Sequence, residues 1–338
     1  MASKTKFMEK SDEYDKLLVA TASGNTEERN AAQDELAKAI TLPLREGVLY
    51  GDNNSFIFTP MQWAPGTQAE FPLDLLAPGE EDEWVAFTSP GAGYIPDKRV
   101  SGNYVTIPTY EIAHAVSWEL KFARQANWGI VQRALAVCNS GFTRKKNNDA
   151  WHTVLAAGVD RNILVYDADA SAGQFTKRLV SLTKSVMSRN AGGNATSLKR
   201  GRLTDMFMSI EGVEDIRNWN LDQVDEVTRR EIYLADDNSD TILRVFGVNI
   251  HPMYEFGEGQ EYQNYFTNQL SGSIQGSDAE LAIGLDLSDD SSFVMPWTMP
   301  LEMFADPAFH RQGVESYYGR MDMGLGVLDS RKVLMLSF

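Results

Sequence analysis

The spacing of hydrophobic and polar residues changes several times along the 338-residue chain, and each change predicts a different kind of element. In residues 26–40 helix formers dominate, Asn25 or Thr26 can cap the first turn, and early glutamates complement the helix dipole. We expect a helix there that stops at Pro43. Its apolar residues are mostly alanines, which favours docking on a neighbouring molecule, with packing on the chain's own core as the alternative.

Residues 49–108 have a different character. Seven prolines interrupt every candidate helix, and short β-forming runs such as FIFT, EWVAFT and YVTIPTY lie between them. Together with an acidic turn at residues 79–83, this pattern predicts a long, projecting β-hairpin. A hairpin of that size is marginal in water unless its faces are covered. We therefore expect another copy of the chain to cover it.

A proline-free segment at residues 113–157 predicts one long helix or two helices in line. Apolar residues at spacings of three and four mark one face of it: Trp128, Val131, Leu135, Cys138, Phe142, Trp151, Val154 and Leu155. Gly141 could kink this helix. Cys138 lies on the apolar face, so we interpret it as a small buried hydrophobe and not as a reactive thiol.

After Gly158 short strands alternate with helices, which is typical of an α+β fold around a mixed sheet. Strands are expected at 162–168, at 202–209 as a buried central strand, at 242–253, and twice within 313–338. Helices are expected at 175–190, 210–219 and 225–234. In the first of these helices Phe175, Leu179, Leu182 and Val186 form the predicted buried stripe, and the solvent face is purely basic. The apolar residues 333–338 predict a strand pinned in a sheet.

The composition is that of a globular protein, with 43% hydrophobic and 23% charged residues, and the net charge of −16 should repel nucleic acid and anionic membranes. The basic residues are nevertheless concentrated. Residues 170–204 carry +7 without an acidic residue and residues 121–161 carry a net +5, which leaves −28 for the remainder. A single basic run is usually a solvated helix face. Two neighbouring runs favour a surface that faces a polyanion, because cations near phosphate release counterions.

We expect no catalytic, cofactor or metal site. The chain has no phosphate-binding loop, no nucleophile elbow and no third glycine to extend the pair at Gly324 and Gly326 into a dinucleotide motif. One cysteine and four scattered histidines supply no zinc cluster or intrachain disulfide. His251 could ligate a metal or act as a base, but a structural role is favoured. The acidic pairs at 236–237 and 289–290 are interpreted as solvated turns.

Neither a signal-peptide core in the first ten residues nor an apolar run near the roughly 20 residues that span a bilayer is present. We therefore expect synthesis in a reducing cytosol and no membrane partner.

The order of these segments resembles the major capsid protein family of tailed bacteriophages. The resemblance is carried by the Pro/Gly-rich loop ending in YVTIPTYEI, the long helix after it, the segment LTDMFMSIEGVEDIR, and GVLDSR before the last strand. It implies the α+β tailed-phage major capsid fold. The implied parts are an N-terminal helical arm (1–48), an extended β-hairpin or E-loop with flanking strands (49–108), a peripheral domain with a long spine helix (109–205), a mixed-sheet axial domain (206–312), and C-terminal strands that return to the peripheral domain (313–338).

The resemblance also implies a function: self-assembly through hexamers and pentamers into an icosahedral shell that encloses double-stranded DNA, without enzymatic activity. Such a protein is made in the host cytoplasm and resides in the virion. Its expected partners are itself, packaged DNA bound by nonspecific electrostatics, a separate scaffolding protein, and cement, portal and maturation proteins. Gly141 would be a hinge of the spine helix. The residues expected to face DNA are Arg144, Lys145, Lys146, Lys177, Arg178, Lys184, Arg189, Lys199, Arg200 and Arg202.

Two alternatives stay open. An encapsulin-type nanocompartment shell would share the fold and enclose protein cargo, although the two basic segments favour DNA. An acidic cytosolic enzyme with a noncontiguous active site would show a pocket with perturbed carboxylates.

Overall fold

A computed structural model describes residues 12–50, 56–72, 104–190, 201–219, 243–269, 279–288 and 290–338. The chain forms two compact units, each built from separate stretches of sequence. Unit 1 comprises Met1–Phe71, Thr106–Ala150 and Phe293–Gly326. Unit 2 comprises Pro72–Val105, Trp151–Ser292 and Val327–Phe338.

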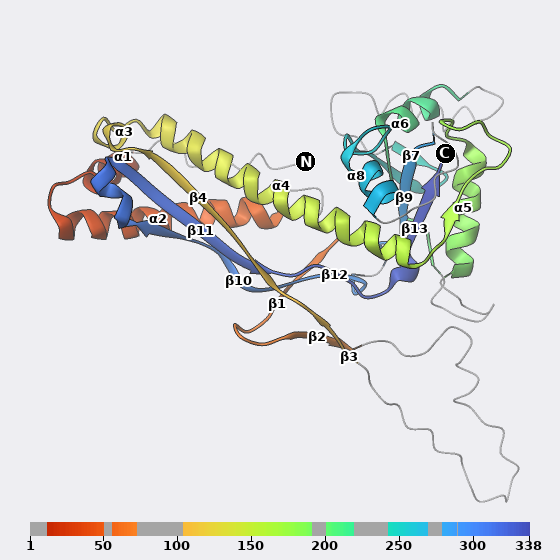
Figure 1. Cartoon of the computed structure of the whole chain (residues 1–338), viewed down its shortest axis with the longest axis horizontal. Coiled ribbons are helices and arrows are strands. Elements are labelled where there is room, and N and C mark those ends of the chain that lie inside the picture. The colour runs from red at the N-terminus through yellow and green to blue at the C-terminus, as the bar shows by residue number, and fades with distance from the viewer. Residues whose placement is uncertain are drawn as a thin grey trace, which may run out of the picture. The chain divides into compact units, whose positions relative to one another are not determined.

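The centre of unit 1 is a long, largely antiparallel sheet (Figure 1). Its strands run in the order β1 (Thr59–Gln62), β10 (Phe293–Asp306), β11 (Val314–Met323) and β4 (Tyr110–Glu119), and β12 (Gly326–Val327) also pairs with β10. Every residue of β4 pairs with β11, so the helix that the sequence predicted from residue 113 was wrong for 113–119. The long-range pairing with β11 overrides the helix-forming alanines of this segment.

Four helices accompany this sheet: α1 (Asp12–Thr21), α2 (Thr26–Tyr50), α3 (Leu120–Arg124) and α4 (Trp128–Asp160), of which α4 continues into the sequence of unit 2. Ala126, with φ of 50°, separates α3 from α4. The predicted apolar face of α4 is confirmed, because all eight of its residues are buried. The helix continues without interruption through Gly141.

Helix α2 differs from the prediction in where it ends and in what it packs against. It continues through Pro43 to Tyr50, so the predicted stop was wrong. Along β10, the Thr41 hydroxyl accepts a 3.1 Å bond from the Met303 amide and donates to the Ala37 carbonyl at 2.8 Å. Buried Leu36, Ile40 and Leu44 complete this packing. The helix therefore covers part of its own sheet, as the alternative interpretation allowed, and satisfies a backbone donor at the edge of β10.

Strands β2 (Ala69–Pro72) and β3 (Tyr104–Ile107) pair in a two-stranded ribbon. The predicted acidic turn and the EWVAFT strand between them lie outside the described residues, and the run FIFT reaches strand conformation only at Thr59. Two glycines pack closely against the end of β3. A Cβ on Gly324 would lie 2.7 Å from the Pro108 carbonyl oxygen, and a Cβ on Gly326 would lie 2.3 Å from Ile107 Cδ1.

Unit 2 has a six-stranded mixed sheet in the order β5 (Leu164–Val165), β13 (Val333–Ser337), β9 (Leu281–Leu285), β6 (Asp205–Met208), β8 (Val248–Pro252) and β7 (Leu243–Val245). The helices among its described residues are α5 (Lys177–Asn190), α6 (Ile210–Arg217) and α8 (Glu261–Asn264), the last continued by a π-helix at Tyr265–Gln269. The predicted central strand β6 and the predicted C-terminal strand β13 are confirmed: both are buried along their whole lengths and have a neighbouring strand on each side.

Two expectations for unit 2 need correction. The single strand expected at 242–253 is a tight hairpin, because Phe246 and Gly247 both adopt positive φ (49° and 78°), as in a type I′ turn. The buried stripe of α5 runs through Leu179, Val180, Thr183 and Met187, and the predicted Leu182 and Val186 are only partly buried at its margin. The helix predicted at 225–234 lies outside the described residues.

Candidate assembly and nucleic-acid surfaces

One face of the unit 1 sheet is open, and so is its β4 edge. Strand β4 ends the sheet, and no strand among the described residues pairs with its outer edge. The side chains on the open face alternate along the strands: those of β4 are exposed at Glu111, Ala113, Ala115 and Ser117. A ten-residue exposed edge is a ready template for pairing with another chain.

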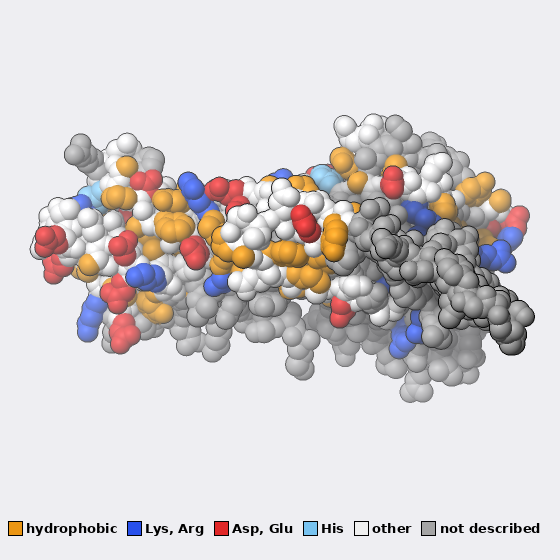
Figure 2. All heavy atoms as spheres, turned by 90° about the horizontal axis from the view of Figure 1, so that it is seen from below, with side chains coloured by type: hydrophobic (Ala, Val, Ile, Leu, Met, Phe, Trp, Pro, Cys, Tyr) orange, Lys and Arg blue, Asp and Glu red, His pale blue; other side chains and the backbone are white. Residues whose placement is uncertain are grey.

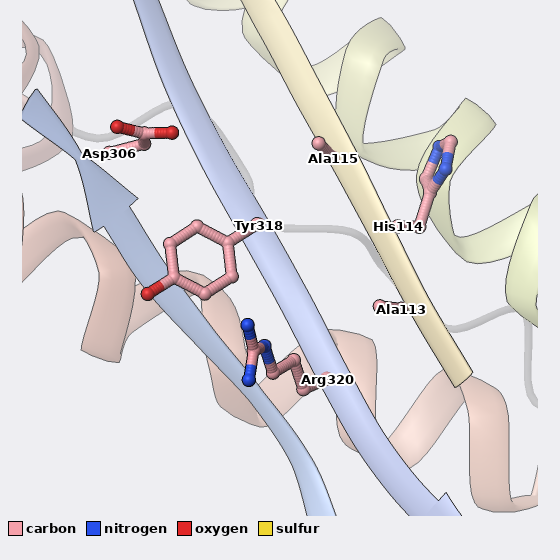
Figure 3. Close-up of a pocket in the computed structure, with 6 residues that line it drawn as sticks. All are labelled: Ala113, His114, Ala115, Asp306, Tyr318 and Arg320. Atoms are coloured by element: carbon pink, nitrogen blue, oxygen red, sulfur yellow. The ribbon is translucent and has the colours of Figure 1, made fainter. Parts of the chain in front are cut away.

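A hollow of about 380 Å³ lies on this open face (Figure 3). The small side chains of Ala113 and Ala115 leave room beside Tyr318 and Arg320, their partners in register on β11. The ring of Phe304 stacks on Tyr318 with centroids 5.4 Å apart, and the Arg320 guanidinium lies 5.4 Å from the centre of the Tyr318 ring. Aromatic rings beside a guanidinium are the side chains that dominate protein interfaces.

The opposite face of the same sheet packs against the chain's own helices, although Tyr110 and His114 at one end of β4 stay partly accessible. His114 points toward α4 (Figure 3), and its ring meets that of Phe142 edge-on at 6.0 Å. Further along, the buried Glu315 carboxylate accepts hydrogen bonds from Tyr317 (2.7 Å) and Thr21 (3.0 Å), as well as from the Trp118 indole. Burial outweighs these bonds and raises the pKa of Glu315. This network fixes α1 to the covered face, so only the other face is available to a partner.

Hydrophobic side chains also gather where Figure 1 places β1 and the β2–β3 ribbon, as Figure 2 shows from below. Tyr104 in β3 is 66% exposed, and Phe56, just before β1, is 46% exposed. Exposed aromatic side chains of this kind are typical of an association surface.

Of the three sequence-predicted DNA-facing residues in unit 1, two reach the surface. Arg144 and Lys145 are exposed on α4, and Lys145 forms a 2.7 Å ion pair with Asp149, one turn later. Lys146 is only 2% exposed, so its ammonium cannot contact DNA outside the fold. We therefore remove Lys146 from the set. The sequence signal for this was available, because Lys146 follows Phe142 by four residues on the buried face of the helix.

In unit 2 one cation on the basic solvent face of α5 is paired with carboxylates of the preceding loop. Arg178 forms ion pairs with Asp167 and Asp169, two carboxylates that lie just before the basic segment 170–204. Asp167 also accepts a 2.8 Å bond from Thr176, whose hydroxyl caps the first turn of α5 by accepting from the Leu179 amide. The cap and the ion pair together fix the preceding loop to the start of the helix.

The other predicted DNA-facing cations of residues 170–204 fall into three groups. Lys184 donates a 2.7 Å hydrogen bond to the carbonyl of Phe246 at the tip of the β7–β8 hairpin. Lys177, Arg189 and Arg202 are exposed. Lys199 and Arg200 lie outside the described residues. The surface cations that keep a possible role in DNA contact are thus fewer than the charge count suggested.

His251, the strongest candidate for chemistry in the sequence, has a structural environment. Its Nε2 lies 2.9 Å from Asp205, and its ring stacks on Phe207 with centroids 4.7 Å apart. Burial alone would raise the pKa of Asp205, but hydrogen bonds from His251, Thr204 and Asn249 outweigh it and lower that pKa. This network joins β6 to β8 and supports the structural interpretation.

The remaining candidates for chemistry are the Cys138 thiol and a metal site. Burial raises the pKa of the Cys138 thiol to about 11, as suits a small buried hydrophobe. No group of three or more histidine, cysteine or carboxylate side chains within the described residues could hold a metal ion. In the same part of the chain, none of the helices combines the length and apolar character needed to span a bilayer.

The chain has the tailed-phage capsid fold. It superimposes on the capsid of an empty GTA particle with a TM-score of 0.50 and 13% identity, over 84% of this chain and 89% of that one. A chain of Mycobacterium phage Bobi gives a TM-score of 0.52 and 12% identity, covering 82% of this chain and 87% of the other. The head of Helicobacter pylori bacteriophage KHP40 gives 0.50 and 8%, covering 82% and 86%. No family model and no curated protein sequence matches the chain.

Proposed function

We propose that this chain is a major capsid protein of a tailed phage, which assembles into an icosahedral shell around double-stranded DNA and has no catalytic role. The observation that carries the proposal is the unit 1 sheet, with one face covered by the chain's own helices and the other face and the β4 edge open. The capsid structures that share its fold support this interpretation. The shell protein is made in the host cytoplasm and resides in the virion.

The open sheet face and edge are the surface we assign to a neighbouring copy. A contact between two different surfaces of identical subunits closes into rings, which accounts for hexamers and pentamers. Residues 49–108 supply the complementary E-loop with its flanking strands. Residues 1–48, 109–205, 206–312 and 313–338 act as arm, peripheral domain, axial domain and returning strands. A separate scaffolding protein guides assembly, and portal, cement and maturation proteins complete the particle.

The assembly surface is tested by placing charge in the hollow. We expect Ala113→Lys/Ala115→Lys to leave the subunit folded, since both side chains are exposed, and to abolish particles seen by sedimentation and electron microscopy. The matched control is Ala136→Lys/Val137→Lys on the exposed side of α4, which should assemble. Normal assembly of the first variant would contradict the assignment of this face.

The E-loop is tested by deletion of residues 75–96. The shortened chain should remain a folded subunit with an unchanged circular dichroism spectrum and lose assembly. An unfolded product would place that segment in the subunit core and contradict its role between copies.

The DNA-facing role is tested on the exposed cations of unit 2. Arg189→Glu/Arg202→Glu should form particles of normal size with less DNA, measured by the ratio of absorbance at 260 and 280 nm. Lys184 and Arg178 are left unchanged because their intramolecular bonds would confuse the result. Unchanged DNA content would refute an inward orientation of this surface, and particles filled with protein would favour the encapsulin alternative.

A further inference from the structure

A buried carboxyl group in unit 1 connects helix α1 to the sheet. Glu315, on β11, is 1% exposed, and the three side chains in contact with it are buried as well: Thr21 at the end of α1, Trp118 on β4 and Tyr317 on β11. Figure 1 shows α1 at the end of the sheet where β11 begins. Glu315 therefore joins two strands to a helix residue that lies 294 positions earlier in the chain.

Four polar contacts meet at this carboxyl group. Tyr317 donates to Glu315 Oε1 at 2.7 Å, and the Trp118 indole donates to Glu315 Oε2 at 3.3 Å. The hydroxyl oxygen of Thr21 lies 3.0 Å from Glu315 Oε2 and 2.7 Å from the carbonyl oxygen of Leu18. Each contact needs a hydrogen between its two heavy atoms, because two acceptors that face each other at these distances repel.

An ionised Glu315 leaves this arrangement one hydrogen short. Two hydroxyls and one indole supply one hydrogen each, which makes three hydrogens for four contacts. The Leu18 carbonyl can only accept, and its contact with Thr21 is the shorter of the two that this hydroxyl makes. A proton on Glu315 Oε2 supplies the missing hydrogen. The hydrogen bond between Thr21 and Glu315 therefore runs from the acid to the hydroxyl when Glu315 is protonated, and in the reverse direction only when it is ionised.

The charges around Glu315 also favour its neutral form. In the part of the chain that the structure describes, it forms no ion pair. The titratable groups that face it are Tyr317 and, through Tyr317, Asp34 of α2; burial and both carboxylates raise the pKa of Tyr317, which stays a neutral donor. Asp15, nearly two turns before Thr21 on α1, is a carboxylate and cannot neutralise it. Burial raises the pKa of Glu315 in the direction that the hydrogen count requires.

We propose that Glu315 is a proton-dependent latch, which holds the end of α1 on the sheet while it is protonated and loosens it on ionisation. An ionised Glu315 is a buried charge without a partner, and Thr21 then has to give up either Leu18 or Glu315. Because the folded pKa of Glu315 is raised, the stabilisation is fully present below the ordinary value of about 4.3 and is lost as the pH rises through the folded value. The latch lies within one subunit, so it does not depend on the proposed self-assembly.

The first test determines the direction of the hydrogen bond at Thr21. The pKa of Glu315 is measured in the unassembled full-length chain by ¹³C NMR of its carboxyl carbon, assigned through the backbone. Thr21→Val keeps the shape and removes the hydroxyl, so the neutral acid loses its acceptor and the acid dissociation constant should rise about tenfold. Thr41→Val removes a hydroxyl that bonds in the same way on α2, and as the control it should leave the constant unchanged. A constant that falls or stays the same in Thr21→Val, or a parent pKa at or below about 4.3, would overturn the proposal.

The second test follows α1 itself by amide hydrogen exchange, corrected for the intrinsic rate at each pH. In the parent chain the protection of residues 12–21 should fall several-fold between about pH 5 and about pH 8. Glu315→Gln cannot ionise and its amide can donate to Thr21, so α1 should stay protected across this range, although the long contact with Trp118 is lost. Glu302→Gln makes the same change at an exposed position on β10, and as the control it should follow the parent.

The same pH dependence in Glu315→Gln as in the parent chain, or a parent chain whose α1 protection does not change with pH, would overturn the latch. If Glu315→Gln does not fold, the NMR titration of the parent chain and of Thr21→Val still decides whether Glu315 is protonated in the folded state. Both tests use the unassembled subunit, so failure to form particles would refute the proposed function and leave the latch intact.

Discussion

The two sheets of this protein differ in how much of their strands is exposed. In unit 2 the inner strands β13, β9 and β6 are buried along their entire lengths. In unit 1 the outer strand β4 has exposed residues along most of its length and a free edge. The first sheet completes its core with its own residues, and the second leaves a face and an edge for another molecule. The difference separates a sheet that completes its own core from the sheet that we propose as the association surface.

The largest effect should come from truncating the buried sheet. Leu336→Ala in β13 removes a fully buried side chain and should lower the free energy of unfolding by about 2–5 kcal/mol, measured by chemical denaturation. Tyr318→Ala on the open face should cost far less stability and should instead impair particle formation. The comparison fails if the two variants lose stability equally.

A smaller loss is expected at the glycines that pack against β3. In Gly324→Ala the new methyl group meets a backbone carbonyl, which cannot move as a side chain does, so we expect a loss of about 1–3 kcal/mol. Gly129→Ala in α4, whose new methyl group would lie 3.8 Å from Asn127 Oδ1, serves as the control and should not destabilise. Equal thermal midpoints for both variants would show that the close approach carries no cost.

Low pH should destabilise unit 2 through protonation of Asp205. Its pKa is lowered in the folded state, so its stabilising effect is present above the unfolded value of about 3.9 and is lost as the pH falls through the folded value. Asp205→Asn should lose about 1–2 kcal/mol at neutral pH and show a shallower loss of stability below pH 4. If Asp205→Asn loses stability below pH 4 as steeply as the parent protein does, protonation of Asp205 is not the cause of that loss.

The smallest effect concerns α4. Gly141→Ala adds a methyl group where no atom lies within 4 Å, so the helix should gain about 0.5–1 kcal/mol. If Gly141 is a hinge of the spine helix, the same variant should slow the change from precursor to mature shell, followed by time-resolved scattering. A more stable subunit with unchanged maturation would exclude the hinge.

Local sequence patterns predicted the elements whose periodicity is set by burial. The apolar face of α4, the buried strand β6 and the C-terminal strand β13 all follow from residues adjacent in the chain. The errors occurred where residues that are distant in the sequence determine the local structure. Strand β4 takes its form from β11, and α2 continues through Pro43 while packing along β10.

The candidate surfaces were harder to predict, because charge along a sequence does not report burial or pairing. Lys146 is buried, and Arg178 is paired with carboxylates from the preceding loop. The hollow of β4, β10 and β11 combines residues from remote segments, so no local spacing could reveal it. Whether the remaining cations face DNA stays a prediction.

The pairing of β4 with β11 also bears on how the protein is made. Ser316 donates to the Val116 carbonyl across a separation of 200 residues in sequence. At a synthesis rate of about 5–20 residues per second, the ribosome needs roughly 10–40 s to deliver the partner of a strand that has already emerged. During that interval the nascent chain exposes both edges of β4, so prolonged shielding by chaperones should matter more for the yield of this protein than for one whose contacts are local.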